Sequence, residues 1–260
     1  MELIELEQAL DSLIMKDNNR PVVVFSALWP LMTVLNSPRQ EIPEKVLQVL
    51  MSLVGKDRDL LMPTFTNGYQ EGVCDLDKVT STTGVLSETF RQSLGVKRSL
   101  SAFFSFGIKG PHEEEFCSLQ PKDAWGEGSC YHWMEEQDAL FLMMGTHPTN
   151  CSYVHRMEWL ARAKINYRYP KKFSGTLIRN GVSHLMDETL YVRALDPSPV
   201  NDFTVLQDSF LAHGMKILSL EGVSIAAMTA QAMKQAYLPL LEQDPLITVE
   251  NRDLFELITN

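Results

Sequence analysis

Six consecutive apolar residues, Ala139 to Met144, stand in the middle of the chain and end directly at Gly145. A run this short, with no polar alternation, predicts a strand that is buried on both faces of a sheet. Two more such runs are Pro21–Ser26 and Leu60–Phe65. Around these runs, helical spacing of apolar residues covers Leu3–Met15, Pro43–Val54, Gly84–Leu94, Tyr153–Ala163, Phe203–His213 and Val223–Leu241. The alternation predicts an α/β fold: one large domain over residues 1–260, with a mostly parallel central sheet flanked by helices.

The remaining segments carry weaker signals. Ala27–Leu31 and the polar segment Thr66–Thr83 are predicted to be loops, and loops as long as the second are often functional. Ala102–Ile108 is predicted to be a strand and Tyr131–Glu136 a short helix. The segment from Lys164 to Arg179 is basic and rich in Tyr and Lys. No element is predicted for it.

Composition limits the classes of function. Hydrophobic residues make up 45% and charged residues 22% of the chain, as in ordinary soluble globular proteins. The net charge of −10 argues against a nucleic-acid partner, which would require clustered Lys and Arg. Four cysteines without a C-x-x-C pair predict no metal site and no disulfide framework. Because the sequence shows no signal peptide and no apolar run of membrane-spanning length, we expect a cytoplasmic protein.

The polar residues after Gly145 are the candidates for chemistry. They lead into a helix, capped by Ser152 or Asn150, beyond the carboxyl end of a buried strand, where α/β sheets bind ligands. His155 and Glu158 are three residues apart and share one face of that helix, so an imidazole beside a carboxylate is available as a general base. The alternative is a solvated surface pair, and His147 in the same loop is a second candidate histidine.

Several pieces of the chain, in this order, resemble the aminoglycoside 3-N-acetyltransferase family. They are Leu60–Thr64, Thr83–Arg91, Arg98-Ser99 with Ser105-Phe106 and Gly110-Pro111, Ala124–Ser129, Ser152-x-x-His155-x-x-Glu158, and Tyr167–Tyr169 with Lys171–Phe173. The resemblance covers roughly residues 20 to 240. The chain departs from the family at Phe25-Ser26-Ala27-Leu28, where members usually have His-Ser-Ser-Leu, and at Asn36-Ser37-Pro38, Ser101-Ala102 and Ser152-Tyr153.

The resemblance implies an acyl-CoA-dependent N-acyltransferase of the EC 2.3.1 type. His155 would be the general base. Glu158 would orient the imidazole or hold the cationic amine before attack, and Ser152 would donate to the oxyanion or merely cap the helix. Acetyl-CoA or another acyl-CoA would be the co-substrate, with no metal; its pantetheine arm would contact Ser26 and Leu28. Its phosphates would contact Arg98, Ser99 and Ser105, although a surface salt bridge is the alternative for Arg98.

The acceptor that the resemblance implies is cationic. An aminoglycoside, as in antibiotic resistance, or another amino sugar would be met by Asp75, Asp77, Glu127 or Glu71. We expect a monomer or homodimer. Two other hypotheses remain open: a hydrolase that uses Cys151 with His155, and a catalytically silent relative that serves as a binding or scaffold subunit.

Overall fold

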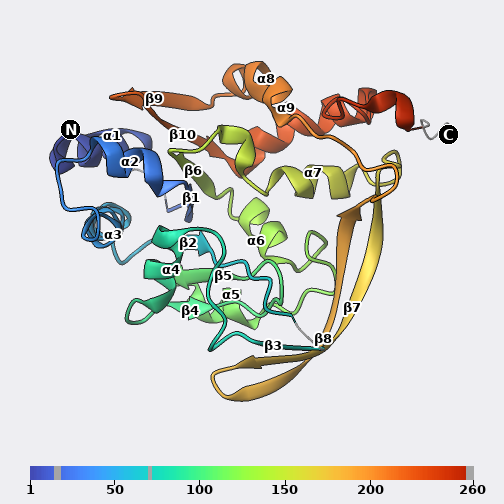
Figure 1. Cartoon of the computed structure of the whole chain (residues 1–260), viewed down its shortest axis with the longest axis horizontal. Coiled ribbons are helices and arrows are strands. Elements are labelled where there is room, and N and C mark those ends of the chain that lie inside the picture. The colour runs from blue at the N-terminus through green and yellow to red at the C-terminus, as the bar shows by residue number, and fades with distance from the viewer. Residues whose placement is uncertain (15–18, 70–71, 256–260) are drawn as a thin grey trace.

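A seven-stranded sheet forms the centre of the computed structural model, which describes residues 1–14, 19–69 and 72–255 (Figure 1). The strand order is β4-β5-β2-β1-β6-β10-β9. Among the described residues, β1 pairs in parallel with β2 and β6, and the other pairings are antiparallel. The strands are β1 (Val22–Ser26), β2 (Leu60–Pro63), β4 (Lys97–Arg98), β5 (Phe106–Lys109), β6 (Leu140–Met144), β9 (Lys216–Leu220) and β10 (Val223–Thr229).

The α/β prediction is therefore confirmed, but the sheet is mixed rather than mostly parallel. The difference lies in the outer strands. The connection from β9 to β10 consists of Glu221 and Gly222, which both have positive φ. A two-residue turn of this kind can join only antiparallel neighbours, whereas parallel strands require a long crossover.

Helices cover both faces of the sheet and form a hydrophobic core on each face. Alternating residues of each strand point into one core or the other. Val22 and Val24 of β1 face one core, and Val23 and Phe25 face the other. The first core receives α1 (Leu3–Ile14), α2 (Leu28–Val34), α3 (Ile42–Val54) and α4 (Val85–Gln92). The second receives α5 (Glu113–Ser118), α6 (Cys130–Glu136), α7 (Val154–Leu160), α8 (Gln207–Ala212) and α9 (Ala230–Gln243). Burial on both faces explains why the central strands are continuous apolar runs.

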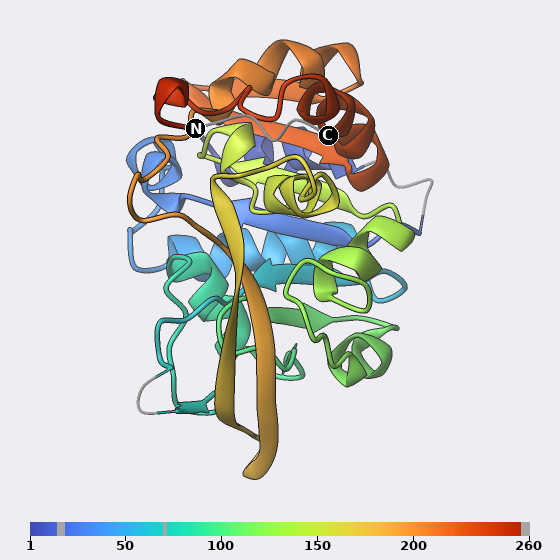
Figure 2. The same ribbon diagram turned by 90° about the vertical axis from the view of Figure 1, so that its right-hand side faces the viewer.

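A second, three-stranded sheet extends away from the first (Figure 2). It consists of β3 (Val73–Asp75) and a long hairpin of β7 (Arg168–Arg179) and β8 (Val182–Arg193). The prediction lacked this hairpin because its strands are largely exposed and show no apolar run. The Asn180-Gly181 turn, with positive φ at both residues, is the sequence signal that identifies it.

Most of the predicted helices are present, whereas several predicted bounds differ from the structure. The helices at α1, α3, α4, α6 and α7 are confirmed, although the predicted end of the first one, Met15, lies outside the described residues. Ala27–Leu31 is not a loop, because α2 begins at Leu28, and the strand predicted over Ala102–Ile108 begins only at Phe106. Val223–Leu241 is not one helix but β10 followed by α9. Within the described part of the chain, no helix is long and apolar enough to cross a membrane.

Candidate active site

The loop after β6 brings two strand ends together. Gly145 has φ +65°, and a Cβ at this position would overlap the carbonyl oxygen of Ala27 at the end of β1. Glycine is therefore required both for the conformation and for the close approach. From here a 3₁₀ turn, Pro148–Asn150, leads into α7, whose first turn carries His155. The predicted position of His155 beyond the carboxyl end of β6 is thus observed.

His155 and Glu158 form a tight pair. The Nδ1 atom of His155 lies 2.6 Å from Oε2 of Glu158. The Glu158 side chain is fully buried, while 26% of the His155 side chain is exposed. Two aromatic rings contact the imidazole edge-to-face, Trp125 at 6.0 Å and Phe203 at 5.7 Å between centroids. A solvated surface pair is excluded, because the carboxylate has no access to water.

Two residues that begin the hairpin hold Glu158 in place. The Tyr167 hydroxyl donates to Oε1 over 2.9 Å, and Nε of Arg168 lies 2.9 Å from Oε2. Both belong to a segment that the resemblance included without assigning it a role. The signal that could have found Arg168 is physical: a buried carboxylate beside a neutral imidazole requires a cation.

The charges of the cluster follow from these contacts. Burial alone would raise the pKa of Glu158, but Arg168, His155 and Tyr167 together hold it below its usual value. Burial, and after it the Arg168 guanidinium, lower the pKa of His155, although Glu158 acts in the opposite direction. At neutral pH, Glu158 is therefore ionised and His155 is neutral. The Nδ1–H group donates to Glu158, and Nε2 is left as an unprotonated base.

Buried contacts fix α7 relative to Trp125. Arg156 donates through Nε to Oε2 of Glu135 over 3.0 Å, and through Nη1 to the Trp125 carbonyl oxygen. One turn on, Nε1 of Trp159 donates to Oδ2 of Asp123 over 2.9 Å. The helix that carries the base and the loop that carries its aromatic wall therefore move as one unit.

Ser152 does not cap α7. The residue before the helix is Tyr153, and no side chain accepts a hydrogen bond from the first turn. Instead, Oγ of Ser152 lies 2.7 Å from the Tyr131 hydroxyl, at the start of α6. A pair of hydroxyl groups next to the base is compatible with the predicted oxyanion donor, which stays a prediction.

The predicted phosphate ligands Arg98, Ser99 and Ser105 form a buried structural cluster. Arg98 donates to Ser105 Oγ and to three carbonyl oxygens, those of Thr64, Leu76 and Val79, at 2.6–3.0 Å. Oγ of Ser99 accepts from the Phe106 amide. The guanidinium of Arg98 already satisfies three buried carbonyl groups, which would otherwise lack a hydrogen-bond partner. The geometry therefore argues against all three residues as coenzyme ligands. It also argues against a surface salt bridge for Arg98.

Ser26 and Leu28 lie where the prediction placed them. Ser26 is half-buried at the end of β1, beside Gly84 at the start of α4, and Leu28 is buried at the start of α2. Their contacts with pantetheine stay a prediction.

The predicted acceptor carboxylates are dispersed. Asp77 accepts from the amides of Asn180 and Gly181 at the hairpin turn, and Asp75 pairs with Lys78. Asp75 is in register with Ile178, ten residues along β7 from Arg168. At about 3.3 Å per residue this is roughly 33 Å along the strand, too far for an acceptor held at His155. Glu71 lies outside the described residues, and Glu127 is exposed, two residues from Trp125.

The alternative nucleophile and base are not available. Cys151 is fully buried, and burial raises the pKa of its thiol to about 12, so it is not a thiolate at neutral pH. Nδ1 of His147 lies 2.7 Å from Oγ1 of Thr149 in its own loop, and Nε2 lies 3.2 Å from Oε1 of Gln207, so both ring nitrogens have partners. Among the described residues, no group of His, Cys, Asp and Glu is arranged to hold a metal ion.

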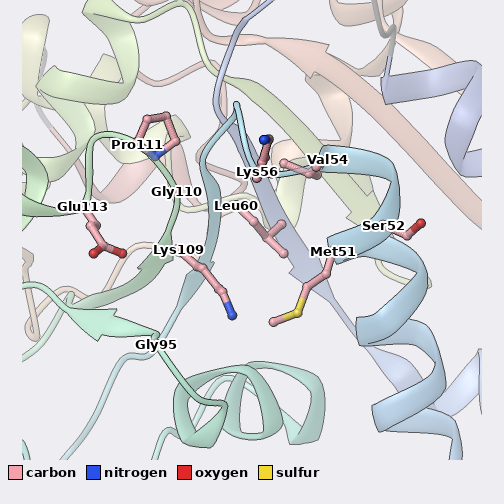
Figure 3. A pocket seen from close by; sticks show the side chains of 11 residues that line it. Met51, Ser52, Val54, Lys56, Leu60, Gly95, Lys109, Gly110, Pro111 and Glu113 are labelled. Carbon is pink, nitrogen blue, oxygen red and sulfur yellow. The ribbon is translucent and has the colours of Figure 1, made fainter.

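Several hollows surround the sheet. One of about 440 Å³ includes Gly145, Thr146 and His147, and one of about 280 Å³ includes Arg168 and Trp159; they adjoin the segments before and after His155. Figure 3 shows a larger one, about 580 Å³, between Met51 of α3 and Lys109 of β5. It is lined by Leu60, the first residue of β2, and thus lies at the opposite edge of the sheet from His155.

Comparison with known proteins agrees with this architecture. The family model of the aminoglycoside 3-N-acetyltransferases matches residues 32–242. AAC-IIIb in a binary complex with CoASH has a TM-score of 0.75 and 19% identity, over 94% of this chain and 97% of that one. AAC-VIa bound to sisomicin has a TM-score of 0.76 and 18% identity, over 94% of this chain and 98% of that one. The YokD protein from Bacillus subtilis has a TM-score of 0.69 and 15% identity, over 92% of this chain and 99% of that one. No curated protein sequence matches the chain significantly.

Proposed function

The chain belongs to the aminoglycoside 3-N-acetyltransferase family, and from this premise we propose that it transfers an acetyl group from acetyl-CoA to an amine of an amino sugar, with His155 as the general base. One observation carries the assignment of the base. Glu158, buried and ionised beside Arg168, holds Nδ1 of His155 and leaves Nε2 free. The structures of AAC-IIIb with CoASH and of AAC-VIa with sisomicin support the choice of co-substrate and acceptor.

The reaction requires two proton transfers, one from the acceptor amine and one to the departing sulfur of CoA. The neutral acceptor amine attacks the thioester carbonyl, and Nε2 of His155 accepts the N–H proton as the new C–N bond forms. The resulting imidazolium is stabilised by Glu158, as the carboxylate of a catalytic triad stabilises its histidine. Collapse of the tetrahedral intermediate breaks the C–S bond, and the departing CoA thiolate takes up the proton held by His155, which returns the imidazole to its neutral form. The hydroxyl pair of Ser152 and Tyr131 would donate to the oxyanion.

The coenzyme would enter at the carboxyl edge of the central strands. There Ser26 and Leu28 follow β1, and backbone comes close at Gly84 and Gly145. An acetyl-CoA-dependent reaction is consistent with a cytoplasmic enzyme, acting as a monomer or homodimer.

One of the two departures behind the silent-relative hypothesis has a structural explanation. The hypothesis was based on departures at Phe25 and Ser101. Ser101, however, binds Glu188 and caps the turn at Phe103 and Phe104, so it has a structural use of its own. The cluster of His155, Glu158 and Arg168 is complete.

The test combines binding and turnover. Calorimetric titration with CoA and acetyl-CoA should show binding to the wild type and to His155→Ala alike. Release of free thiol in the presence of amino sugars should fall by about 10²–10⁴-fold in His155→Ala, the usual contribution of a positioned base. Absence of CoA binding to the wild type would overturn the acetyltransferase proposal, and unchanged turnover in the variant would remove His155 as the base.

A further inference from the structure

The basic segment that follows the catalytic helix has no role in the mechanism so far. Between Trp159 and Met186 the chain has six Lys and Arg side chains and no Asp or Glu, although its net charge is −10. The first of these cations, Arg162, lies at the end of α7, and the others follow along the connection and β7. In Figure 1, α7 lies beside the end of the hairpin where β7 begins. This basic segment therefore starts directly at the catalytic cluster, and within it Lys172 is paired with Asp187 of β8.

A hollow of about 280 Å³ opens on this surface. Arg162 and Arg168 line it together with three aromatic side chains, Trp159, Tyr169 and Tyr191. Asp123 also lines it, but both of its oxygens already accept hydrogen bonds, from the Trp125 amide and from Trp159 Nε1. The hollow therefore offers cationic and aromatic surface, with two arginines against one carboxylate that is already hydrogen-bonded at both oxygens.

Arg162 is the cation in this hollow with unused donors. Its guanidinium lies 3.8 Å from the centroid of the Trp159 ring, and Nη1 donates to the Trp159 carbonyl oxygen. Within the described part of the chain, no carboxylate pairs with it. Two more exposed cations lie near this end of the hairpin, Lys171 and Arg193, the latter opposite Arg168 in the β7–β8 register. A stacked guanidinium with free N–H groups is preorganised for bidentate binding of an oxyanion.

The location of the hollow indicates whether CoA or the acceptor would occupy it. Arg168 lines the hollow and also reaches His155, since its Nη2 lies 3.2 Å from Nδ1. An occupant therefore lies one side chain away from the imidazole, on the side of its Nδ1 atom. The phosphates of CoA are separated from the thioester by the whole pantetheine arm, whereas the acceptor must present its amine at the base. The hollow thus belongs to the acceptor.

We propose that the acceptor of this enzyme is an acidic amino sugar, whose phosphate or carboxylate group is bound by Arg162 in the hollow beside Arg168. This inference rests on the proposed acetyl transfer. The proposal takes the place of the earlier expectation that Asp75 and Asp77 bind a polycationic acceptor. These two residues lie at the other end of β7. A polycationic aminoglycoside would meet like charge at this surface.

Two acceptors that differ by one group provide the test: glucosamine 6-phosphate and glucosamine. We expect kcat/KM for the phosphorylated sugar to exceed that for glucosamine by about 10-fold or more, the range of a hydrogen bond to a charged group. The preference should decrease with added salt, because exposed charges are screened. Direct titration with glucosamine 6-phosphate, without acetyl-CoA, measures the same preference independently of turnover.

Charge reversal locates the site. Arg162→Glu should abolish the preference for the phosphorylated sugar, Arg162→Lys should retain part of it, and Arg39→Glu, the same change at a remote exposed arginine, should leave it intact. Equal binding and turnover of the two sugars, or a preference that survives Arg162→Glu, would overturn the inference. Acetylation of aminoglycosides but not of acidic sugars would overturn it while leaving the acetyltransferase proposal standing.

Discussion

The ionisation state of His155 is decided by its immediate neighbours. A histidine near the start of a helix has an ordinary pKa unless its surroundings change it. Here burial and Arg168 lower the pKa of His155, and Glu158 only partly opposes them. The imidazole is therefore in its basic form at neutral pH, which suits a group that must accept a proton. Arg168 has two roles at once: it keeps Glu158 ionised and His155 neutral.

This arrangement predicts the pH dependence of the reaction. Activity requires neutral His155, so kcat/KM should fall as pH decreases through the lowered pKa, below about 6.5. Arg168→Gln removes a positive charge that disfavours the imidazolium. The pKa of His155 should then rise, and the acid limb of the pH–rate profile should move to higher pH.

The control for this experiment is Arg179→Gln, at the other end of the same strand, where the acid limb should stay in place. A purely structural role of Arg168 would lower the rate at every pH without moving the limb. That outcome would contradict the electrostatic assignment.

The elements that position the base are short and depend on close backbone approaches. Strand β6 ends at Gly145, where the chain must adopt positive φ next to the Ala27 carbonyl group. The loop beyond it, Thr146–Tyr153, is stabilised by its own hydrogen bonds, such as those of Asn150 to Thr146 and to His147. The path of the chain from β6 into α7 thus depends on Gly145.

A pair of glycines tests this dependence. Gly145→Ala introduces backbone strain and also an overlap with Ala27, whereas Gly222→Ala, at φ +85° with nothing within 4 Å, introduces strain alone. We expect the first to cost at least about 2 kcal/mol more in the free energy of unfolding than the second. Urea denaturation measures both.

Turnover should distinguish them as well. Because Gly145 precedes the loop to His155, its alanine variant should lose acetyl transfer, and Gly222→Ala should not. Equal stabilities of the two variants would show that the loop can relax away from β1, and the proposed dependence would then be incorrect.

At the scale of the whole molecule, one buried carboxylate joins three helices that are distant in sequence. Glu135 of α6 binds Arg156 of α7 at 3.0 Å and Lys234 of α9 at 2.6 Å. The hydroxyl of Tyr153 also donates to it. These contacts close the core on the side of the sheet where His155 lies.

Adjacent glutamates permit a matched comparison. Glu135→Gln leaves two cations without their anion and should lower the free energy of unfolding by about 3 kcal/mol. Glu136→Gln alters a side chain that is 61% exposed and 3.8 Å from His132, so its effect should be close to zero. Chemical denaturation of the two variants side by side is the measurement. A similar, small effect in both would show that Glu135 is dispensable for joining the helices.

The sequence by itself determined the features that depend on local pattern. Continuous apolar runs identified β1, β2 and β6, because strands buried on both faces have no polar alternation. Helical spacing identified α1, α3 and α7, and the spacing of His155 and Glu158 placed them on one face. Two elements were not predicted. The β7–β8 hairpin was missed because its exposed strands have no apolar run, and buried β10 was merged with α9 because both are apolar.

Only the tertiary structure decided which polar residues meet. Arg168 reaches Glu158 because β7 starts beside α7, and Trp125 reaches His155 because Arg156 holds its loop. The same long-range pairing moved Asp75 and Asp77 to the far end of the hairpin and enclosed Arg98 among carbonyl groups. The physical reason is that a side chain's chemistry depends on its burial and partners, and partners separated by many residues are set by the packing of the whole chain.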